Sequence, residues 1–265
     1  VLLRSLNMED TKMNDLIKDC VGCGLCAIEC PKHAISMHSN EEGFLYPEID
    51  EQTCDGCDIC NLVCKGYKKQ CHQKNKAPKV KACQTLDERW LIESTAGGFF
   101  PTLAQWVIEQ NGVVFGTAYS TNMIPVVCKA ESIEEVYRFN GSKYVQSDLS
   151  LALPEVKAEL EKGRIVLFSG TPCQVAAVKT LCKEFVGKSL LTMDVVCYGV
   201  PSPGLFRAFL DTIEKKNQAK VVDYRFRDKH KNGWSHTTVI TMVDADGNTM
   251  QYDEEDYSRI PYYKM

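Results

Sequence analysis

Apolar and polar positions along residues 84–265 change period from block to block, which predicts a mixed order of helices and strands. Apolar residues at helical spacing predict helices over residues 97–112, 132–139, 152–163, 173–184 and 202–218. Apolar or alternating runs predict strands over residues 113–120, 124–130, 164–170, 189–199, 221–228 and 237–253, the last turning back at Asp246-Gly247. This order indicates an α/β or α+β layered domain.

Residues 1–64 follow a different pattern, with short turn-rich segments and many cysteines. Residues 34–37 and 44–50 predict two short strands joined by a turn. The cysteines form two runs with the same C-x2-C-x2-C-x3-C spacing, namely Cys20, Cys23, Cys26 and Cys30, then Cys54, Cys57, Cys60 and Cys64. The first part of the chain therefore contains an internal repeat.

Residues 65–81 separate the two patterns and hold seven lysines and no acidic residue. Such a charge run is typical of a solvated linker. A docking site for an acidic partner is the alternative interpretation.

The composition is that of an ordinary globular protein, with 44% hydrophobic and 25% charged residues. The net charge of -4 gives no global reason to expect nucleic acid or an anionic membrane as a partner. No apolar run approaches the roughly 18 residues of a membrane-spanning helix, and the opening residues lack the core of a secretory signal. We therefore expect a cytoplasmic protein, in which 14 cysteines indicate metal or redox chemistry rather than disulfides.

The duplicated spacing is typical of proteins that hold two [4Fe-4S] clusters through thiolates. Three cysteines of each run share a loop and reach one cluster, while the fourth, at the start of a helix pointing away, reaches the other. We predict one cluster on Cys20, Cys23, Cys26 and Cys64, and a second on Cys54, Cys57, Cys60 and Cys30. Structural zinc is the alternative, but zinc sites with four cysteines do not usually interleave in this way.

Four segments follow the repeat in a fixed order: STAGGFFPTLAQWVIEQNGVVFGTAYS, NGSKYVQSDL, LFSGTPCQVAAVKTL and DVVCYGVPSP. With the repeat, they resemble the family of coenzyme F420 hydrogenase/dehydrogenase beta subunits over residues 15–265. The resemblance implies an α+β chain with a bacterial-ferredoxin-like domain (15–66), a lysine-rich linker (67–83) and an α/β layered flavin-binding domain (84–265). Relatives run longer, so it also implies a chain truncated at its C-terminal end.

In activity, the resemblance implies an iron–sulfur flavoprotein oxidoreductase. Its flavin, usually FAD, would pass electrons between the clusters and a deazaflavin or another small substrate. A protein electron donor or acceptor is the other expected partner. The alternatives are a non-catalytic electron-transfer subunit that feeds a partner enzyme, and a cluster-binding module without flavin.

Three places in these segments are candidate flavin contacts. Residues 94–98 open a helix, whose N–H groups and positive dipole end suit a phosphate, although an ordinary helix cap explains them as well. The pair at 143–144 matches a family block near the flavin, the alternative being a surface lysine beside a packed tyrosine. The predicted cofactor-binding residues are Ser94, Thr95, Gly97, Gly98, Lys143, Tyr144 and, where a buried strand meets a helix, Gly170 and Thr171.

Two more cysteines are candidate metal ligands. Cys173 lies in the first turn of the helix predicted after Gly170, and Cys197 lies near the end of the next strand, at the same edge of the sheet. The resemblance implies that such a pair holds a third [4Fe-4S] cluster together with a later C-x2-C segment beyond this chain. Buried core cysteines, or a nucleophilic Cys173, are the alternatives. No catalytic residue is predicted, and Trp234 and His236 are either substrate contacts or packed side chains.

Overall fold

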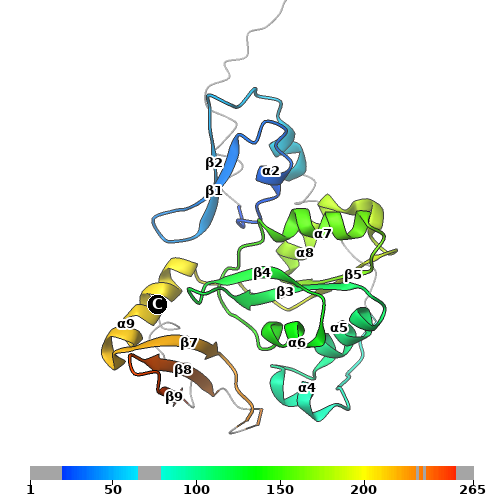
Figure 1. Cartoon of the computed structure of the whole chain (residues 1–265). Coiled ribbons are helices and arrows are strands. Elements are labelled where there is room, and N and C mark those ends of the chain that lie inside the picture. The colour runs from blue at the N-terminus through cyan, green and yellow to red at the C-terminus, as the bar shows by residue number, and fades with distance from the viewer. Residues whose placement is uncertain (1–19, 65–78, 231–232, 235–236, 255–265) are drawn as a thin grey trace, which may run out of the picture.

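The computed structural model describes residues 20–64, 79–230, 233–234 and 237–254, and it contains helices and strands in three separate sheets. Figure 1 shows a small N-terminal region at the top, a central sheet between helices, and a further sheet with one helix beside it. This mixture of helix and sheet confirms the expected α+β class.

The central sheet has the strand order β4-β3-β5-β6. Its strands are β3 (Val113–Tyr119), β4 (Pro125–Ala130), β5 (Val166–Gly170) and β6 (Leu190–Asp194). β3, β5 and β6 run parallel, and β4 is antiparallel at the edge. Parallel strands are covered on both faces, which explains their nearly continuous apolar runs.

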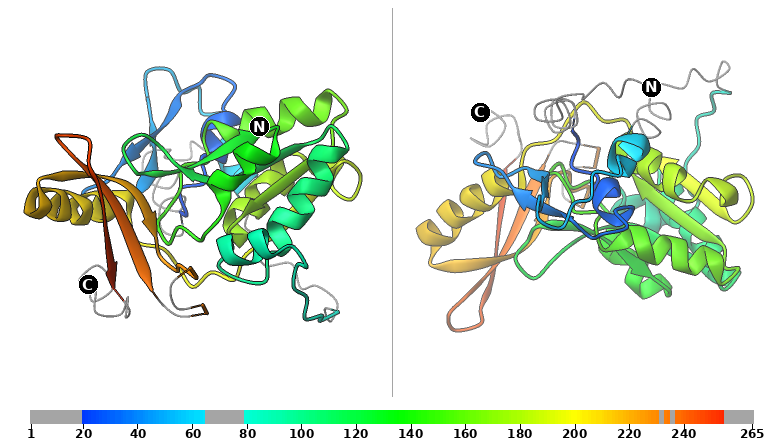
Figure 2. Two further views of the ribbon diagram at one scale, coloured as in Figure 1. Left: turned by 60° about the horizontal axis from the view of Figure 1, so that its bottom comes forward. Right: turned by 90° about the horizontal axis from the view of Figure 1, so that it is seen from above.

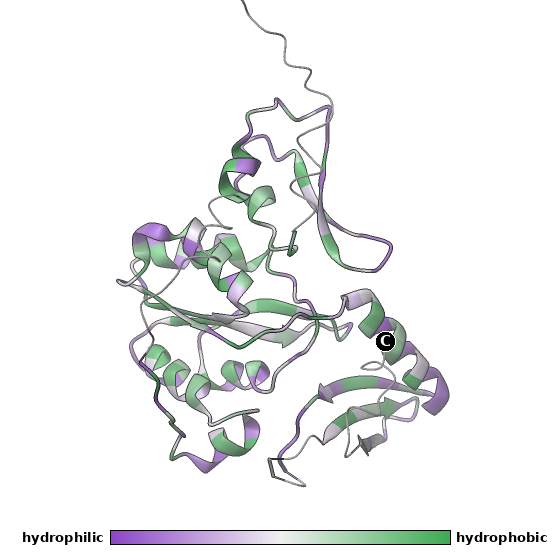
Figure 3. Ribbon diagram, turned by 180° about the vertical axis from the view of Figure 1, so that it is seen from behind, coloured by the Kyte–Doolittle hydropathy of each residue, from purple (hydrophilic) through white to green (hydrophobic). Residues whose placement is uncertain are grey.

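Helices cover both faces of this sheet. They are α4 (Glu88–Glu93), α5 (Phe99–Glu109), α6 (Ile133–Val136), α7 (Ala152–Glu161) and α8 (Pro172–Leu181), with 3-10 turns at Tyr137–Phe139 and Lys183–Phe185. Val113 and Phe115 pack with α7 and α8, whereas Val114 between them packs with α4, α5 and α6. Figure 1 shows the two groups of helices on opposite sides of the strands, and Figure 3 shows apolar residues recurring along both. This packing fixes the edge where the carboxyl ends of β3, β5 and β6 meet, which is where open α/β sheets bind ligands.

The second sheet is an antiparallel meander of β7 (Ala219–Arg225), β8 (Thr238–Asp244) and β9 (Thr249–Glu254). α9 (Pro203–Asn217) packs on it through Phe206, whose ring meets those of Tyr224 and Phe226. Figure 2 shows this unit beside the central sheet. The hydroxyl of Tyr119 donates a hydrogen bond to the Tyr224 carbonyl at 2.9 Å and joins the two sheets.

The N-terminal region is a hairpin between two helical turns. Its elements are α2 (Leu25–Ile28), β1 (Ile35–Ser39) and β2 (Leu45–Ile49), and a helix follows over residues 59–64. The paired strands agree with those expected over 34–37 and 44–50.

Both cysteine runs adopt the same backbone turn. Gly22 and Gly24 of the first run have φ of 66° and 74°, and Gly56 and Asp58 of the second have φ of 73° and 65°. This left-handed conformation is easy for glycine and tolerated by aspartate. The repeat in the sequence is thus a repeat in the backbone.

Two predicted strands were too long. The strand expected over 189–199 ends at Asp194, because its partner β5 ends where α8 begins. The strand expected over 221–228 ends at Arg225, because its partner β8 starts only at Thr238.

Two further details differ from the sequence predictions. Cys30 lies two residues past the end of α2, not at the start of a helix. Helix α4 was not predicted at all. Its only local signal is Asp87, whose side chain caps the helix by accepting the Arg89 N–H at 2.9 Å.

Within the described part of the chain, no helix is both long and apolar enough to cross a membrane. Residues 79–83, the described end of the expected linker, are exposed and have no regular structure. The rest of that linker lies outside the described residues.

Candidate functional site

Four thiols of the N-terminal region lie together next to the main body of the chain. We call Cys20, Cys23, Cys26 and Cys64 the inner set. The thiol of Cys23 lies within electrostatic range of the other three. Burial is the largest cause that raises the pKa of Cys23 and of Cys26, each to about 12. Iron binds thiolates, so cluster assembly here must displace these protons.

The other four cysteines of the repeat, which we call the outer set, are Cys54, Cys57, Cys60 and Cys30. Cys60 lies within electrostatic range of Cys54 and also of Cys26, so the two sets adjoin. Lys32, two residues after Cys30, forms an ion pair with Asp55 at 3.7 Å. The loop of Cys30 therefore lies beside the loop of Cys54.

The donor chemistry of the two sets fits two iron–sulfur clusters. Among the described residues, no three side chains of His, Cys, Asp or Glu come close enough to surround a single metal ion. A [4Fe-4S] cluster is a larger body, held by four thiolates. Eight thiols in two adjoining sets match two such clusters in number and type. The crosswise exchange of Cys64 and Cys30 stays a prediction, which the contacts of Cys23 and Lys32 support.

A segment of the main body holds the first cysteine loop in place. The side chain of Gln146 accepts the Leu45 N–H at 3.0 Å and donates to the Val21 carbonyl at 3.3 Å. Gly22 lies directly against Leu45 and Gln146, since a Cβ there would lie 2.5 Å from the Leu45 oxygen and 2.6 Å from Gln146 Nε2. Only glycine leaves room for this approach.

The same loop is part of the main core. Leu25 is 2% exposed and packs with Leu149 and Leu153 at the start of α7. Gly24 lies against Ser150, whose Oγ would be 3.1 Å from an added Cβ. The inner set is therefore fixed to residues 146–153 by apolar packing as well as by hydrogen bonds.

The tip of the β1–β2 hairpin makes a second contact, at the start of α9. Ser202 Oγ donates a hydrogen bond to the Glu42 carbonyl. Gly43 meets Gly204 closely, because a Cβ on Gly43 would lie 2.6 Å from the Gly204 Cα. Two separate contacts thus set the orientation of the N-terminal region.

A cleft of about 110 Å³ lies between α4, β7 and the segment after the 3-10 turn at residues 137–139. Lys143 lines it and donates to the carbonyls of Arg138 and Asn140, both at 2.9 Å. Its ammonium lies 5.6 Å from the centre of the Tyr119 ring. Burial lowers the pKa of Lys143 to about 8, and the charge of Asp223 offsets only part of this effect.

The wall of the cleft carries more positive than negative charge. Its cations are Arg138, Lys143, Arg225, Arg227 and Lys229, and its acids are Glu93, Asp223 and Asp228. Arg225 is ion-paired with all three acids, at 3.1 to 3.3 Å. With the acids engaged in this way, the cleft suits an anion.

Buried polar atoms without partners occur in the cleft wall and in the segment next to it. Ser94 Oγ and both side-chain amide atoms of Asn140 have no hydrogen-bond partner among the described residues. Asn140 lines the cleft, and Ser94 precedes Thr95, whose hydroxyl accepts the Ser142 N–H at 2.9 Å. A buried polar group left unpaired costs about 1–3 kcal/mol. A ligand with acceptor and donor atoms in the cleft would remove that cost.

Three of the predicted flavin contacts are occupied by packing within the chain. A Cβ at Gly97 would lie 2.7 Å from the Cys83 oxygen, and one at Gly98 would lie 2.5 Å from Thr85 Cγ2. Tyr144 packs edge to face on a phenylalanine of the second unit, with ring centres 5.3 Å apart. Close packing with residues 83–85 explains both glycines.

Gly170 and Thr171 lie at the carboxyl end of β5, where α8 begins as expected. The side chain of Gln174 accepts the Thr171 N–H at 3.0 Å and donates to Ser147 Oγ at 2.7 Å. This junction is therefore tied to the same segment that contacts the cysteine loop and the cleft. It does not line the cleft itself.

Cys173 and Cys197 lie at the carboxyl ends of neighbouring parallel strands. Cys173 is in the first turn of α8, with its sulfur 2.9 Å from Thr171 Oγ1, and it packs against the core that Cys23 also contacts. Cys197 follows β6 by three residues and is exposed. The third cluster stays a prediction.

The sequence predicted no role for Lys229, but its side chain holds the turn before α5. Its ammonium donates to the carbonyls of Leu91 at 3.0 Å and Ala96 at 2.6 Å, and the ring centre of Trp234 lies 3.6 Å away. Lys229 is 6% exposed. Trp234 thus packs on a buried lysine, while His236 lies outside the described residues.

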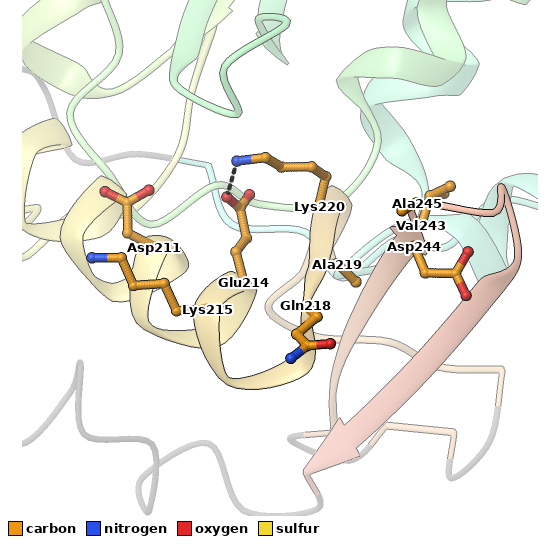
Figure 4. A pocket seen from close by; sticks show the side chains of 9 residues that line it. All are labelled: Asp211, Glu214, Lys215, Gln218, Ala219, Lys220, Val243, Asp244 and Ala245. Atoms are coloured by element: carbon orange, nitrogen blue, oxygen red, sulfur yellow. Dashed lines mark hydrogen bonds and ion pairs between the residues drawn. The ribbon is translucent and has the colours of Figure 1, made fainter.

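A second cavity, of about 350 Å³, lies between the end of α9 and the second sheet (Figure 4). Glu214 faces it and is paired with Lys220 at 2.7 Å and with Arg207 at 3.0 Å. These pairs stabilise the junction of α9 and β7, and we assign the cavity no function.

Two protein families match this chain. Residues 19–66 match the 4Fe-4S dicluster domain, and residues 163–261 match the C terminus of the coenzyme F420 hydrogenase/dehydrogenase beta subunit. The resemblance found in the sequence is confirmed by these matches. The chain has a ferredoxin-like iron–sulfur region at its N-terminal end.

Two curated proteins are similar to parts of this chain. One subunit of the F(420)H(2) dehydrogenase of Methanosarcina mazei is 24% identical over 190 residues, which are 67% of this chain and 53% of that protein. The VorC subunit of the ketoisovalerate oxidoreductase of Methanothermobacter marburgensis is 35% identical over 48 residues, which are 17% of this chain and 61% of that protein. The chain thus spans about half the length of the first relative. Both matches support a redox role.

One solved structure is also similar to this chain. It is the F420-reducing [NiFe] hydrogenase complex from Methanosarcina barkeri, with a TM-score of 0.41 and 15% identity. The alignment covers 64% of this chain and 61% of the chain in the complex.

Proposed function

We propose that this chain is an iron–sulfur flavoprotein oxidoreductase. It passes electrons between two [4Fe-4S] clusters, on the inner and outer sets, and a flavin, most simply FAD. The flavin in turn reduces or oxidises a deazaflavin or another small substrate. The observation that carries the proposal is the approach of Cys64 to the loop of Cys23, since thiols from both runs meet as two interleaved clusters require.

The cleft at Lys143 supports a flavin phosphate as its ligand. Arg138 and Lys143 supply positive charge, and Asn140 supplies buried polar atoms that lack partners among the described residues. The cavity of about 110 Å³ is smaller than the ~300–1,000 Å³ of typical ligand pockets, so the fit concerns the anionic part of the cofactor. A flavin would supply the exchange between one-electron and two-electron steps.

One segment of the chain connects all of these parts. Asn140 and Lys143 lie at the cleft, Gln146 holds the first cysteine loop, and Ser147 binds the α8 junction. Residues 140–150 therefore offer a path of covalent and hydrogen bonds between the first cysteine loop and the cleft. At that junction we also propose Cys173 and Cys197 as two ligands of a third cluster, completed by thiolates outside the described residues.

A second candidate function is a non-catalytic electron-transfer subunit. The relative from Methanosarcina mazei is named as one subunit of a dehydrogenase, and this chain spans about half of it. Turnover of a small acceptor by the isolated chain separates the two functions, because a pure electron-transfer subunit would need its partner enzyme.

Anaerobic purification followed by iron, acid-labile sulfide and flavin analysis tests the proposal. We expect at least eight irons and one flavin per chain, because the clusters on the inner and outer sets hold four irons each. Twelve irons would establish the third cluster, and an iron-free or flavin-free chain would contradict the proposal. Asn140→Ala should lower flavin retention without lowering the iron content.

The pH dependence of flavin binding tests the role of Lys143. Its pKa of about 8 in the free protein lies below the ordinary lysine value, so the ammonium loses its proton as the pH rises through 8. The anionic flavin phosphate binds the protonated form of Lys143. The affinity for FAD should therefore fall above pH 8 by up to tenfold per pH unit, since one proton is lost from Lys143. Lys143→Arg keeps its charge and should abolish this fall, as measured by fluorescence titration of the apoprotein with FAD. An unchanged pH profile in this variant would exclude Lys143 as the titrating group.

A further inference from the structure

The inner and outer sets differ in what surrounds them. Gly22 and Gly24 are buried and Leu25 is 2% exposed, so these residues of the inner loop lie against the main body. Residues 51–58, which carry Cys54 and Cys57, are exposed throughout. One cluster site thus faces solvent, and the other faces the rest of the chain.

The two sets still form a continuous path. Cys60 of the outer set lies within electrostatic range of Cys26 of the inner set. Cys23 of the inner set packs against the same core as Cys173 at the carboxyl edge of the central sheet. An electron that enters at the exposed loop therefore reaches the main body through the inner set.

From this asymmetry we propose that the outer set is the port at which a one-electron redox protein docks, and that the inner set relays electrons between this port and the main body. The proposal rests on the function proposed above and adds to it a partner and a point of approach. A carrier that exchanges electrons by collision needs a cluster near the protein surface. Among the described residues, Cys54 and Cys57 of the outer set are exposed and would hold such a cluster.

The charge of the exposed loop indicates the chemistry of the partner. Glu51, Asp55 and Asp58 lie exposed within it, and Asp50 precedes it. Lys32 is paired with Asp55 and offsets one of these charges. A partner whose docking face carries lysine or arginine is steered to such a surface.

Each transfer moves one electron and no atoms. A cluster on the outer set would gain the one electron that the partner's carrier loses. It would pass that electron to a cluster on the inner set, and two such passages would supply a two-electron acceptor in the main body, which would take its protons from water. The reverse direction follows the same path with donor and acceptor exchanged.

The first experiment measures how closely a paramagnet in solution approaches each cluster. The whole chain is purified anaerobically, reduced, and frozen with or without a dysprosium chelate, and EPR power saturation is recorded for both cluster signals. Cys57→Ser alters only the exposed loop, so the signal that it leaves unchanged belongs to the inner set. We expect the chelate to accelerate relaxation of the outer signal several-fold more than that of the inner signal. Equal acceleration, or a larger effect on the inner signal, would overturn the proposal.

The second experiment tests the charge of the port, with oxidised cytochrome c as a basic one-electron acceptor. Stopped-flow mixing with the reduced chain gives the second-order rate. The Glu51→Lys/Asp58→Lys variant should lower this rate about tenfold at low salt. The Glu88→Lys/Glu134→Lys variant makes the same charge change on the exposed surface of α4 and α6, and should leave the rate near that of the unaltered chain. An equal fall in both variants would overturn the proposed docking face.

The iron count separates failure of this proposal from failure of the proposed function. Fewer than eight irons would remove both. Eight irons with equal relaxation of the two signals would leave the two-cluster assignment in place and remove only the port.

Discussion

The two cysteine loops have the same spacing and the same backbone turn but opposite surroundings. Gly22 and Gly24 of the first loop are buried, whereas Gly56 and Asp58, at the matching positions of the second, are exposed. Residues 146–153 hold the first loop by hydrogen bonds and apolar packing, whereas the second run meets the same core through Val63, which follows its loop. A repeat can therefore supply two equal cluster sites while the rest of the chain gives each a separate role.

The largest expected effect comes from removing the apolar anchor of the first loop. Leu25 is 2% exposed in the main core, so Leu25→Ala should lower the free energy of unfolding by about 2–5 kcal/mol. Leu62 lies in the helix over residues 59–64 and is 69% exposed, so Leu62→Ala should change the free energy of unfolding by less than about 0.5 kcal/mol. Urea unfolding of the anaerobic protein, followed by tryptophan fluorescence, measures both.

Equal losses of unfolding free energy in the two leucine variants would show that the helix over residues 59–64 also buries Leu62 against another surface. The iron content is the control, because neither substitution removes a ligand. A variant that retains its iron and still loses stability has lost packing alone.

The next largest effect separates backbone strain from steric clash. Gly22→Ala and Gly56→Ala both place a side chain at left-handed φ, at a cost of about 1–2 kcal/mol each. At Gly22 the new Cβ also meets the Leu45 oxygen and Gln146, which adds about 1–3 kcal/mol. We expect Gly22→Ala to lose the four irons of the inner set, and Gly56→Ala to keep all eight.

Iron and sulfide analysis after anaerobic purification measures this difference in iron content between the two glycine variants. Gly163→Ala is the matched control, since Gly163 has φ of 79° and an added Cβ would meet nothing within 4 Å. Loss of iron from Gly56→Ala to the same extent as from Gly22→Ala would contradict the assigned difference between the loops.

Much of the fold and of the cysteine site could be predicted from the sequence. The helix expected over 202–218 corresponds to α9, and the hairpin expected over 237–253 corresponds to β8 and β9, because their patterns are long and periodic. The spacing of the cysteines likewise predicted that thiols from both runs would meet, because it is typical of chains in which the fourth cysteine of each run binds the other cluster.

Features that depend on distant contacts could not be predicted. Ile28 and Leu62 occupy matching positions in the two runs and are both apolar, yet only Ile28 packs against the main core. The carbonyls that bind Lys229 lie more than a hundred residues earlier in the chain. Asn140 became a candidate ligand contact only because its side-chain amide is buried without a hydrogen-bond partner among the described residues. No local sequence pattern predicts this.

The smallest expected effect tests whether the second loop depends on its own side chains. Asp58 has φ of 65°, so Asp58→Gly relieves about 1 kcal/mol of left-handed strain. The substitution also adds about 0.5–1 kcal/mol of backbone entropy cost, so the two terms nearly cancel. We expect a net change within about 0.5 kcal/mol in the free energy of unfolding, whereas Asp58→Ala relieves no strain to offset the loss of the carboxylate and should be destabilising. A loss above 1 kcal/mol in Asp58→Gly would show that the bond from Asn61 to the Asp58 carboxylate holds this turn, and that the exposed loop is ordered from within as firmly as the buried loop is from outside.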